Sequence, residues 1–365
     1  MGAEMYDALY RGGKVITVNR HADIVDWVAV KDGKIAALGK ADDEPRASET
    51  VELDGAVLLP GLYDAHCHIM PTGMFMASAN LLKAKSIGET LALIEAKCAS
   101  AGDGEWVFGS GFPLYNIKEG RLPNRHELDS VSGDRPVMVH AQSLHGGALN
   151  SAALKRVNVP DVVGVGRDAD GSLDGVLLSD DSYFTVAAQV MGLLPEAKLK
   201  RFITDCADYA ATKGVTSIVG LIGSFVTDDK DVEIIERDKA EFPVNIVTFY
   251  QTWDLEKVKK YNLPRIGGCL TLDGAGFEYT MALQTPYPDR PERRGFLIHT
   301  DEEIYRLISQ AHREGIQTAF HALGDRAIDQ LLFIFRQVIG EQGNKDLRHR
   351  VEHFSLPQDI HMDML

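Results

Sequence analysis

Apolar and polar residues alternate in short runs over the first sixty residues of the chain, for example in KVITV, WVAV and KIAALG. A period of two is typical of strands that bury one face. Gly and Asp turns separate these runs, and Lys31-Asp32-Gly33-Lys34 contains the Asp-Gly pair that favours a two-residue hairpin. The pattern predicts a small antiparallel β unit at residues 1–59.

From Pro60 onward, apolar strand-like runs alternate with helical patterns, which indicates an α/β fold with a parallel sheet. Six strands are predicted, at 61–66, 214–220, 244–250, 267–272, 315–321 and 348–353. One helix is defined at both ends, because Thr300 and Glu303 form a capping-box pair and Gly315 follows its apolar repeat. Residues 70–200 fit the alternation poorly, so we expect an inserted subdomain there.

Composition and charge narrow the function classes. The 365 residues are 45% hydrophobic and 25% charged, as expected for a soluble globular chain. The net charge of -15 comes without a basic stripe, which argues against a nucleic acid partner. We find no signal peptide and no apolar run long enough for a membrane span, so we expect no membrane partner and a cytoplasmic protein. The four widely spaced cysteines are interpreted as reduced thiols.

Histidines carry the main chemical signal. His66 and His68 follow an apolar run and are separated by one residue, so both side chains would project to the same side of a strand end. Alone, the pair could equally be two polar loop residues. However, His321 and His353 also stand at the ends of strand-like runs, about one βα unit apart. If these four imidazoles converge, they suit zinc, iron, nickel or a similar metal.

Longer motifs around these histidines resemble the metal-dependent amidohydrolase superfamily. The phrases LLPGLYDAHCH, HALGDRAID and RVEHF carry the resemblance. The insertion phrases RLPNRHELDSV, RPVMVHAQSLHGGALNSAAL and GSLDGVLL point to the amidohydrolase family 3 branch, which includes N-substituted formamide deformylase-like proteins. The similarity extends over essentially the whole chain.

The resemblance implies a (β/α)8 barrel of the TIM type at residues 60–365, with residues 1–59 as the N-terminal part of a composite β sandwich. It implies metal ligation by His66, His68, His321 and His353. Motif positions are also matched by Glu352 and by Asp325. Asp325 is expected to contact the substrate, although it stands where it could instead cap a helix. In the insertion, His145 and Asn150 would face the substrate or play a purely structural role, and we expect the insertion to cover the barrel mouth.

Two features depart from the family pattern. Many members place a carboxylated lysine on the fourth strand, where this sequence has Cys269. Cys269 is therefore either a metal ligand or a small core residue. Without the lysine that bridges two ions, one metal ion is favoured over two. In addition, only six βα units are recognisable, so the barrel is expected to be incomplete at its C-terminal end. The eighth-strand Asp, which serves as general base in the family, has no counterpart, and the catalytic residues stay unassigned.

The expected function is hydrolysis of a C–N bond, other than a peptide bond, in an amide-like small molecule by metal-activated water, with zinc or another divalent transition metal as cofactor. Two alternatives remain open: a deaminase of a heterocyclic substrate on the same fold, and a non-catalytic regulatory barrel with a residual metal site. We expect a homo-oligomer.

Overall fold

The structure is a computed structural model that describes residues 5–102, 104–223, 229–276 and 279–365. The chain divides into two compact units, Met1–Leu62 and Tyr63–Leu365, and each is described by itself.

The first unit contains two small sheets. The four-stranded sheet has the order β5-β4-β1-β6 and the three-stranded sheet the order β3-β2-β7. A small core of Leu9, Trp27 and Ala29 is buried in the larger sheet. The strands are β1 (Tyr6–Arg11), β2 (Lys14–Ile16), β3 (Ile24–Val25), β4 (Trp27–Lys31), β5 (Lys34–Gly39), β6 (Ala47–Glu52) and β7 (Val57–Leu58).

The predicted hairpin is confirmed, since β4 and β5 pair antiparallel and both Asp32 and Gly33 have positive φ, as a turn of this kind requires. The prediction of a wholly antiparallel unit is wrong, because β1 pairs with β6, and β2 with β7, in parallel. Alternation of apolar residues shows which face of a strand is buried. It carries no information about the direction of the neighbouring strand.

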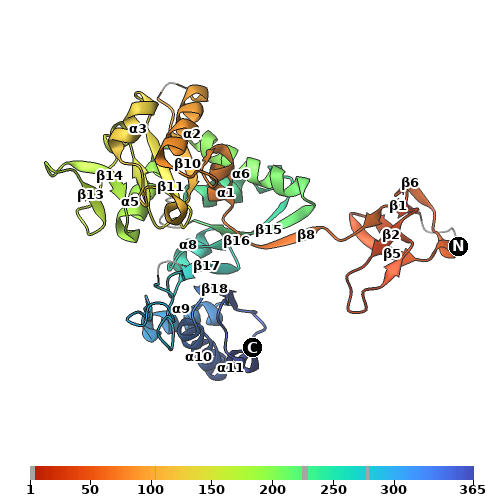
Figure 1. Cartoon of the computed structure of the whole chain (residues 1–365). Helices are drawn as coiled ribbons and strands as arrows, with labels where there is room; N and C mark the ends of the chain where they lie inside the picture. The colour runs from red at the N-terminus through yellow and green to blue at the C-terminus, as the bar shows by residue number, and fades with distance from the viewer. Residues whose placement is uncertain (1–4, 103, 224–228, 277–278) are drawn as a thin grey trace. The chain divides into compact units, whose positions relative to one another are not determined.

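The second unit contains a six-stranded sheet in the order β19-β18-β17-β16-β15-β8, so its strands follow one another in sequence order (Figure 1). Its strands are β8 (Leu62–Cys67), β15 (Val215–Ile222), β16 (Asn245–Tyr250), β17 (Arg265–Thr271), β18 (Gln317–Ala322) and β19 (Arg350–His353). All six predicted strands are present. The pairs from β15 through β19 are parallel, and the sheet has the form of a nearly closed barrel.

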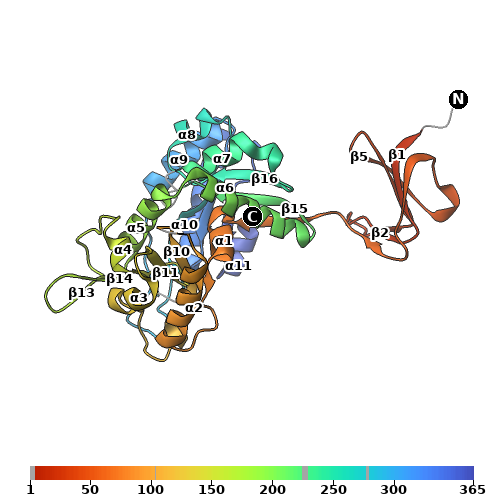
Figure 2. The same cartoon turned by 90° about the horizontal axis from the view of Figure 1, so that it is seen from above.

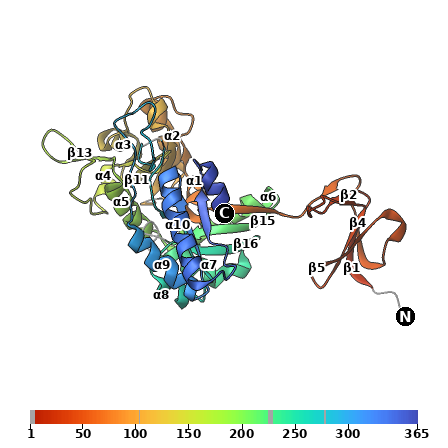
Figure 3. The same cartoon turned by 90° about the horizontal axis from the view of Figure 1, so that it is seen from below.

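Five helices of the second unit precede successive strands of this sheet: α6 (Glu196–Thr212), α7 (Lys230–Asp238), α8 (Leu255–Lys260), α9 (Asp301–Arg313) and α10 (Asp325–Gln342). Helix α11 (Asp359–Met364) follows the last strand. The predicted capping box is present on α9, and Gly315 follows the helix with φ of +75°. Figure 3 shows α9 and α10 side by side. Among the described residues, no helix combines the length and apolar character needed to cross a membrane.

The region predicted as an insertion forms a second six-stranded sheet, in the order β13-β14-β12-β11-β10-β9. Its strands are β9 (Ala79–Asn80), β10 (Val107–Phe112), β11 (Val137–Ala141), β12 (Gly147–Leu149), β13 (Val165–Arg167) and β14 (Leu173–Leu177). Helices in this region are α1 (Ile69–Ala77), α2 (Ile87–Ser100), α3 (Arg125–Ser132), α4 (Ser151–Leu154) and α5 (Asp180–Leu193). Short 3-10 helices occur at Ala41–Asp43, Leu114–Asn116 and Lys239–Glu241.

Helix α1, which follows the first barrel strand, packs against α6 (Figure 2). Gly73 allows the two backbones to touch, because a Cβ atom at this position would lie 1.8 Å from the carbonyl oxygen of Phe202. The contact fixes the segment that carries His66 and His68 against the core.

A chain of hydrogen bonds joins two histidines near the N-terminal ends of β18 and β19. The backbone N–H of Thr318 donates to Nδ1 of His349 at 3.1 Å, so the proton of this neutral ring lies on Nε2. That nitrogen lies 2.9 Å from Nδ1 of His312, whose Nε2 donates to the carbonyl of Gly343 at 2.9 Å. Burial and then the His312 charge lower the pKa of His349 to about 4.

The α1–α6 contact predicts a large effect of one methyl group. Gly73→Ala should lower the free energy of unfolding by roughly 1–3 kcal/mol, because the helices must separate. Gly340→Ala is the matched control, since Gly340 lies in α10 with no atom within 4 Å of its Cβ position. The control should be stabilised by about 0.5–1 kcal/mol. Urea unfolding measures both, and a Gly73→Ala variant as stable as the parent would refute the close packing.

The histidine chain predicts a pH dependence of stability. Because the pKa of His349 is lower in the folded than in the unfolded protein, the unfolded state binds the proton first, and stability falls as the pH drops from about 6.5 towards 4. Protonation of His349 in the unfolded state should lower the free energy of unfolding by about 2 kcal/mol between pH 7 and pH 5. In His349→Asn, whose amide oxygen can still accept from Thr318, the loss measured by urea unfolding should be smaller by that amount. Equal losses in both proteins would contradict this account.

Candidate metal centre

Side chains from four strands of the parallel sheet meet at the ends where those strands finish. Ligand atoms of His66, Cys269 and His353 all lie within 4.8 Å of one another. The ring centroid of His353 is 4.8 Å from that of His66 and 4.6 Å from that of His321. The structure therefore brings His66, His321 and His353 together with Cys269.

His68 borders this group. Its ring centroid is 5.5 Å from that of His66, and the residue precedes α1 at the N-cap position. Burial, followed by the charges of His66 and His353, lowers the pKa of His68 to about 4. His68 is thus next to the cluster. Among the described residues, the ligand atoms within 4.8 Å of one another are those of His66, Cys269 and His353, and the nitrogens of His68 are not in that group.

A β-bulge directs Cys269 into the cluster. The pairing of β17 with β18 shifts between Gly267 and Leu270, and both Gly267 and Gly268 have positive φ, of +91° and +109°. As a result, Sγ of Cys269 lies 3.7 Å from Nδ1 of His321 and 3.6 Å from Nε2 of His353. The residue also packs against the apolar interior of the sheet. Burial raises the pKa of the Cys269 thiol to about 12.

Glu352 orients His66 from the far edge of the sheet. Its Oε2 is 2.6 Å from Nδ1 of His66, which must carry the proton to donate to this carboxylate. Nε2 of His66 is then left with its lone pair. Arg350 pairs with both oxygens of Glu352, at 2.8 and 3.0 Å, and also donates to the carbonyl of Ala65 at 2.8 Å.

Burial and neighbouring charges favour the neutral form of two imidazoles of the cluster, those of His321 and His353. Burial first, and then the charge of His353, lower the pKa of His321 to about 4. Burial and the charge of His66 also lower the pKa of His353. Since neutral imidazole is the form that binds metals, these rings are ready to act as ligands at neutral pH.

Two predicted residues, His145 and Asn150, belong to the insertion. His145 packs edge to face with Phe184 of α5, and its charge is one of the influences that lower the pKa of His321. Asn150 is fully buried and uses its whole amide within the insertion: its oxygen accepts from Val137 and Ala153, and its nitrogen donates to Ser132 and Arg135. It holds α4 and has no group directed at a ligand.

Asp325 is the first residue of α10, and Gly324 before it is the N-cap residue. The alternative prediction that Asp325 caps this helix is therefore wrong. Its carboxylate accepts from the backbone of Gln284 at 2.8 Å and from Nε2 of Gln358 at 3.0 Å. It ties together the loops that surround the cluster.

Sequence reasoning missed two supporting residues. Arg350 was not singled out, although it stands two positions before Glu352 in RVEHF. Asp273, in the Asp-Gly pair of LTLDGAGFEY, was not among the predicted site residues, yet its side chain is completely buried. A lone Asp-Gly pair after an apolar run is most simply a turn signal, which is why the role of Asp273 was not recognisable.

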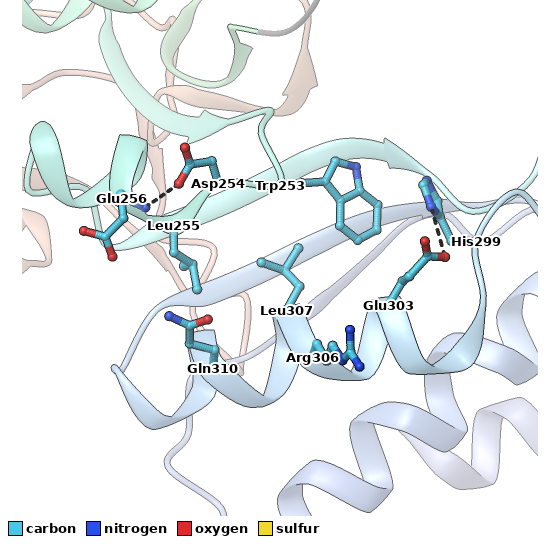
Figure 4. A pocket seen from close by; sticks show the side chains of 9 residues that line it. All are labelled: Trp253, Asp254, Leu255, Glu256, His299, Glu303, Arg306, Leu307 and Gln310. Carbon is cyan, nitrogen blue, oxygen red and sulfur yellow. Dashed lines mark hydrogen bonds and ion pairs between the residues drawn. The ribbon is translucent and has the colours of Figure 1, made fainter.

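A separate open pocket lies between α8 and α9 (Figure 4). In it, the Trp253 indole lies against the His299 ring at 4.3 Å between centroids, and Glu303 approaches the same imidazole at 3.9 Å. The clustered histidines are not among the residues that line it. This pocket is distinct from the candidate metal centre.

Comparison with known proteins places the chain in a family. A sequence profile described as the amidohydrolase family matches residues 49–359. The putative amidohydrolase YtcJ of Bacillus subtilis is 27% identical over 93% of this chain and 68% of its own length. The protein LONG AFTER FAR-RED 3 of Arabidopsis thaliana is 26% identical over 95% of this chain and 64% of its own length. The N-substituted formamide deformylase of Arthrobacter pascens is 25% identical over 96% of this chain and 69% of its own length. The chain thus spans about two thirds of the length of these relatives.

A solved structure supports the fold. An uncharacterized metal-dependent hydrolase from Pyrococcus horikoshii OT3 superposes with a TM-score of 0.79 at 23% identity, over 98% of this chain and 72% of that one. The family profile covers most of the chain and includes all the clustered histidines. The resemblance predicted from the sequence motifs is confirmed, and the chain belongs to the amidohydrolase family of hydrolases.

Proposed function

We propose that this protein is a metal-dependent hydrolase that cleaves the C–N bond of an amide-like small molecule. The observation that carries the proposal is the meeting of His66, Cys269 and His353, whose ligand atoms lie within 4.8 Å of one another at the ends of parallel strands. In barrels of this type, the ends of the strands are where catalytic residues gather.

The donor set fits one transition metal ion. Imidazole nitrogens and a thiolate are ligands of intermediate to soft character, which suit zinc better than magnesium or calcium. His66 through Nε2, His353 and Cys269 would hold the ion together with His321, whose Nδ1 lies 3.7 Å from the Cys269 sulfur, and His68 would lie beside them. When bound, such an ion supplies a Lewis acid that polarises a carbonyl and makes water acidic.

The chain's own residues prepare this site. Glu352 fixes the ring of His66 by accepting the proton on Nδ1, and Arg350 holds Glu352 through both oxygens. His145, from the insertion, is the residue we propose to face the substrate, because its charge reaches His321. An acyl or formyl group would be presented to the strand ends, and the insertion would limit which amines can enter.

The name of one relative supports an amide as the substrate. One of them is named as an N-substituted formamide deformylase, and this supports N-formyl or N-acyl amines as the substrate class. If the protein were a deaminase, Glu352 would have to act as the acid that protonates the leaving nitrogen. This carboxylate is instead paired with Arg350 and His66, which leaves it in an orienting role.

The proposal is tested by hydrolysis of a panel of N-formyl and N-acyl amines together with cyclic amidines. We expect turnover of the amides, loss of turnover after chelation, and recovery with zinc. His353→Asn should bind at least tenfold less metal and lose activity, since it removes a ligand while Asn tolerates the positive φ of +69° at this position. Metal content by elemental analysis accompanies each assay.

The control is His21→Asn, which removes an exposed histidine from the first unit and should retain metal and activity. Turnover that survives chelation, or a His353→Asn variant with full metal content, would overturn the proposal. Activity on cyclic amidines alone would replace it with a deaminase.

Cys269 provides a second, more specific prediction. If its sulfur is a ligand, X-ray absorption should detect a sulfur neighbour at about 2.3 Å from the metal, and Cys269→Ser should lower metal content and activity together. Cys98→Ser is the matched control, because Cys98 is a buried thiol in the separate core of the insertion. If both variants lose only stability and keep their metal, Cys269 is a packing residue.

A further inference from the structure

Asp273, directly after β17, is a carboxylate with no exposed surface. It accepts three backbone hydrogen bonds, from Ala282 at 2.9 Å, Leu323 at 3.0 Å and Gly324 at 2.9 Å. Ala282 belongs to the loop that leads to α9, whereas Leu323 and Gly324 belong to the turn after β18. One side chain therefore joins two loops that border the metal centre.

His321 lies in β18, two residues before the turn that Asp273 binds. Oδ1 of Asp273 lies 3.6 Å from Nε2 of His321, and the carbonyl oxygen of Gly274 lies 3.3 Å from the same nitrogen. Nδ1, on the other side of the ring, is 3.7 Å from Sγ of Cys269. Since two oxygen acceptors face Nε2, the proton of the neutral ring belongs there, and Nδ1 presents its lone pair to the cluster.

The surroundings leave this arrangement little freedom. A Cβ atom on Gly324 would lie 1.9 Å from the carbonyl oxygen of Ala282, so the two loops touch through their backbones. The same carbonyl accepts from the backbone of Arg326 at 3.2 Å. A shift of Asp273 would therefore displace the start of α10 and the His321 ring together.

We propose that Asp273 is a positioning residue that sets the orientation and tautomer of His321, so that Nδ1 faces the metal centre. This inference rests on the proposed metal site. A hydrogen-bonded outer partner commonly orients a ligating histidine, and its loss typically weakens metal binding by about 10–100-fold. Glu352 accepts a direct hydrogen bond from His66 at 2.6 Å, whereas Asp273 acts on His321 from 3.6 Å and through the turn that it fixes, next to the hydrogen bond from the ring to Gly274. The two histidines thus expose opposite ring nitrogens, Nε2 of His66 and Nδ1 of His321.

The test compares Asp273→Asn with Asp325→Asn. Asp325 is the matched control, because it is a buried carboxylate at the start of α10, beside the turn that Asp273 binds. It also accepts a backbone hydrogen bond, from Gln284, but its bonds do not involve His321. The first readout is the tautomer of His321 in metal-free protein, from nitrogen-15 shifts of its ring. The second is the affinity for Co²⁺, from competition with a chromophoric chelator.

We expect Nε2–H at His321 in the parent protein and in Asp325→Asn. Asp273→Asn should lose this preference and bind Co²⁺ about 10–100-fold more weakly than the control. If both variants lower the thermal midpoint equally without changing the tautomer or the affinity, Asp273 is only structural and the inference is overturned.

If Asp273→Asn does not fold, the tautomer of His321 in the parent protein carries the test. Nδ1–H would overturn the inference, and Nε2–H is the result that it requires. Failure of the parent to bind Co²⁺ would overturn the proposed function. The tautomer shift in Asp273→Asn would still support the positioning role in that case, so the two failures are distinguishable.

Discussion

The link between His66 and Glu352 is the interaction on which the metal centre depends. These residues are 286 positions apart and lie on β8 and β19, the two edge strands of the parallel sheet. Arg350 reinforces the link by pairing with Glu352 and donating to Ala65 of β8, while its guanidinium lies 5.1 Å from the ring centroid of Phe249 inside the sheet. Because a buried charge is costly unless it is paired, losing any member of this group leaves another uncompensated.

A second constraint is the crowding of imidazoles. Rings of His66, His321 and His353 lie with centroids less than 5 Å apart in neighbouring pairs, so they cannot all be protonated at moderate cost. Burial and repulsion between neighbouring rings lower the pKa values of His321, His353 and the adjacent His68. The result is a set of desolvated lone pairs that converge on one region. A bound cation is the partner that satisfies them best, which is why the cluster is more readily understood as a metal centre than as a packing motif.

Much of the fold was predictable, because its signals are local. The six strands and the capped α9 follow from apolar periodicity, the capping box and Gly315, and these signals place three histidines at strand ends. Strand direction in the first unit was not predictable, since alternation is the same for parallel and antiparallel partners. The roles of Asn150 and Asp273 were also hidden. A buried amide and a buried carboxylate are used according to which backbone N–H groups surround them, and those groups come from distant parts of the chain.

The side-chain directions at the cluster depend on places where regular structure ends. In a regular strand, consecutive side chains point to opposite faces, so Glu352 and His353 could not both reach the cluster. Positive φ values at His353 and Phe354, of +69° and +47°, end β19 and turn the His353 ring back towards Cys269 and His66. On β17, the two glycines of the bulge do the same for Cys269. Non-glycine residues adopt such conformations only when surrounding contacts compensate the strain. Periodicity can therefore locate the ends of the strands, whereas the ligand set is determined by backbone distortions that have no periodic signal.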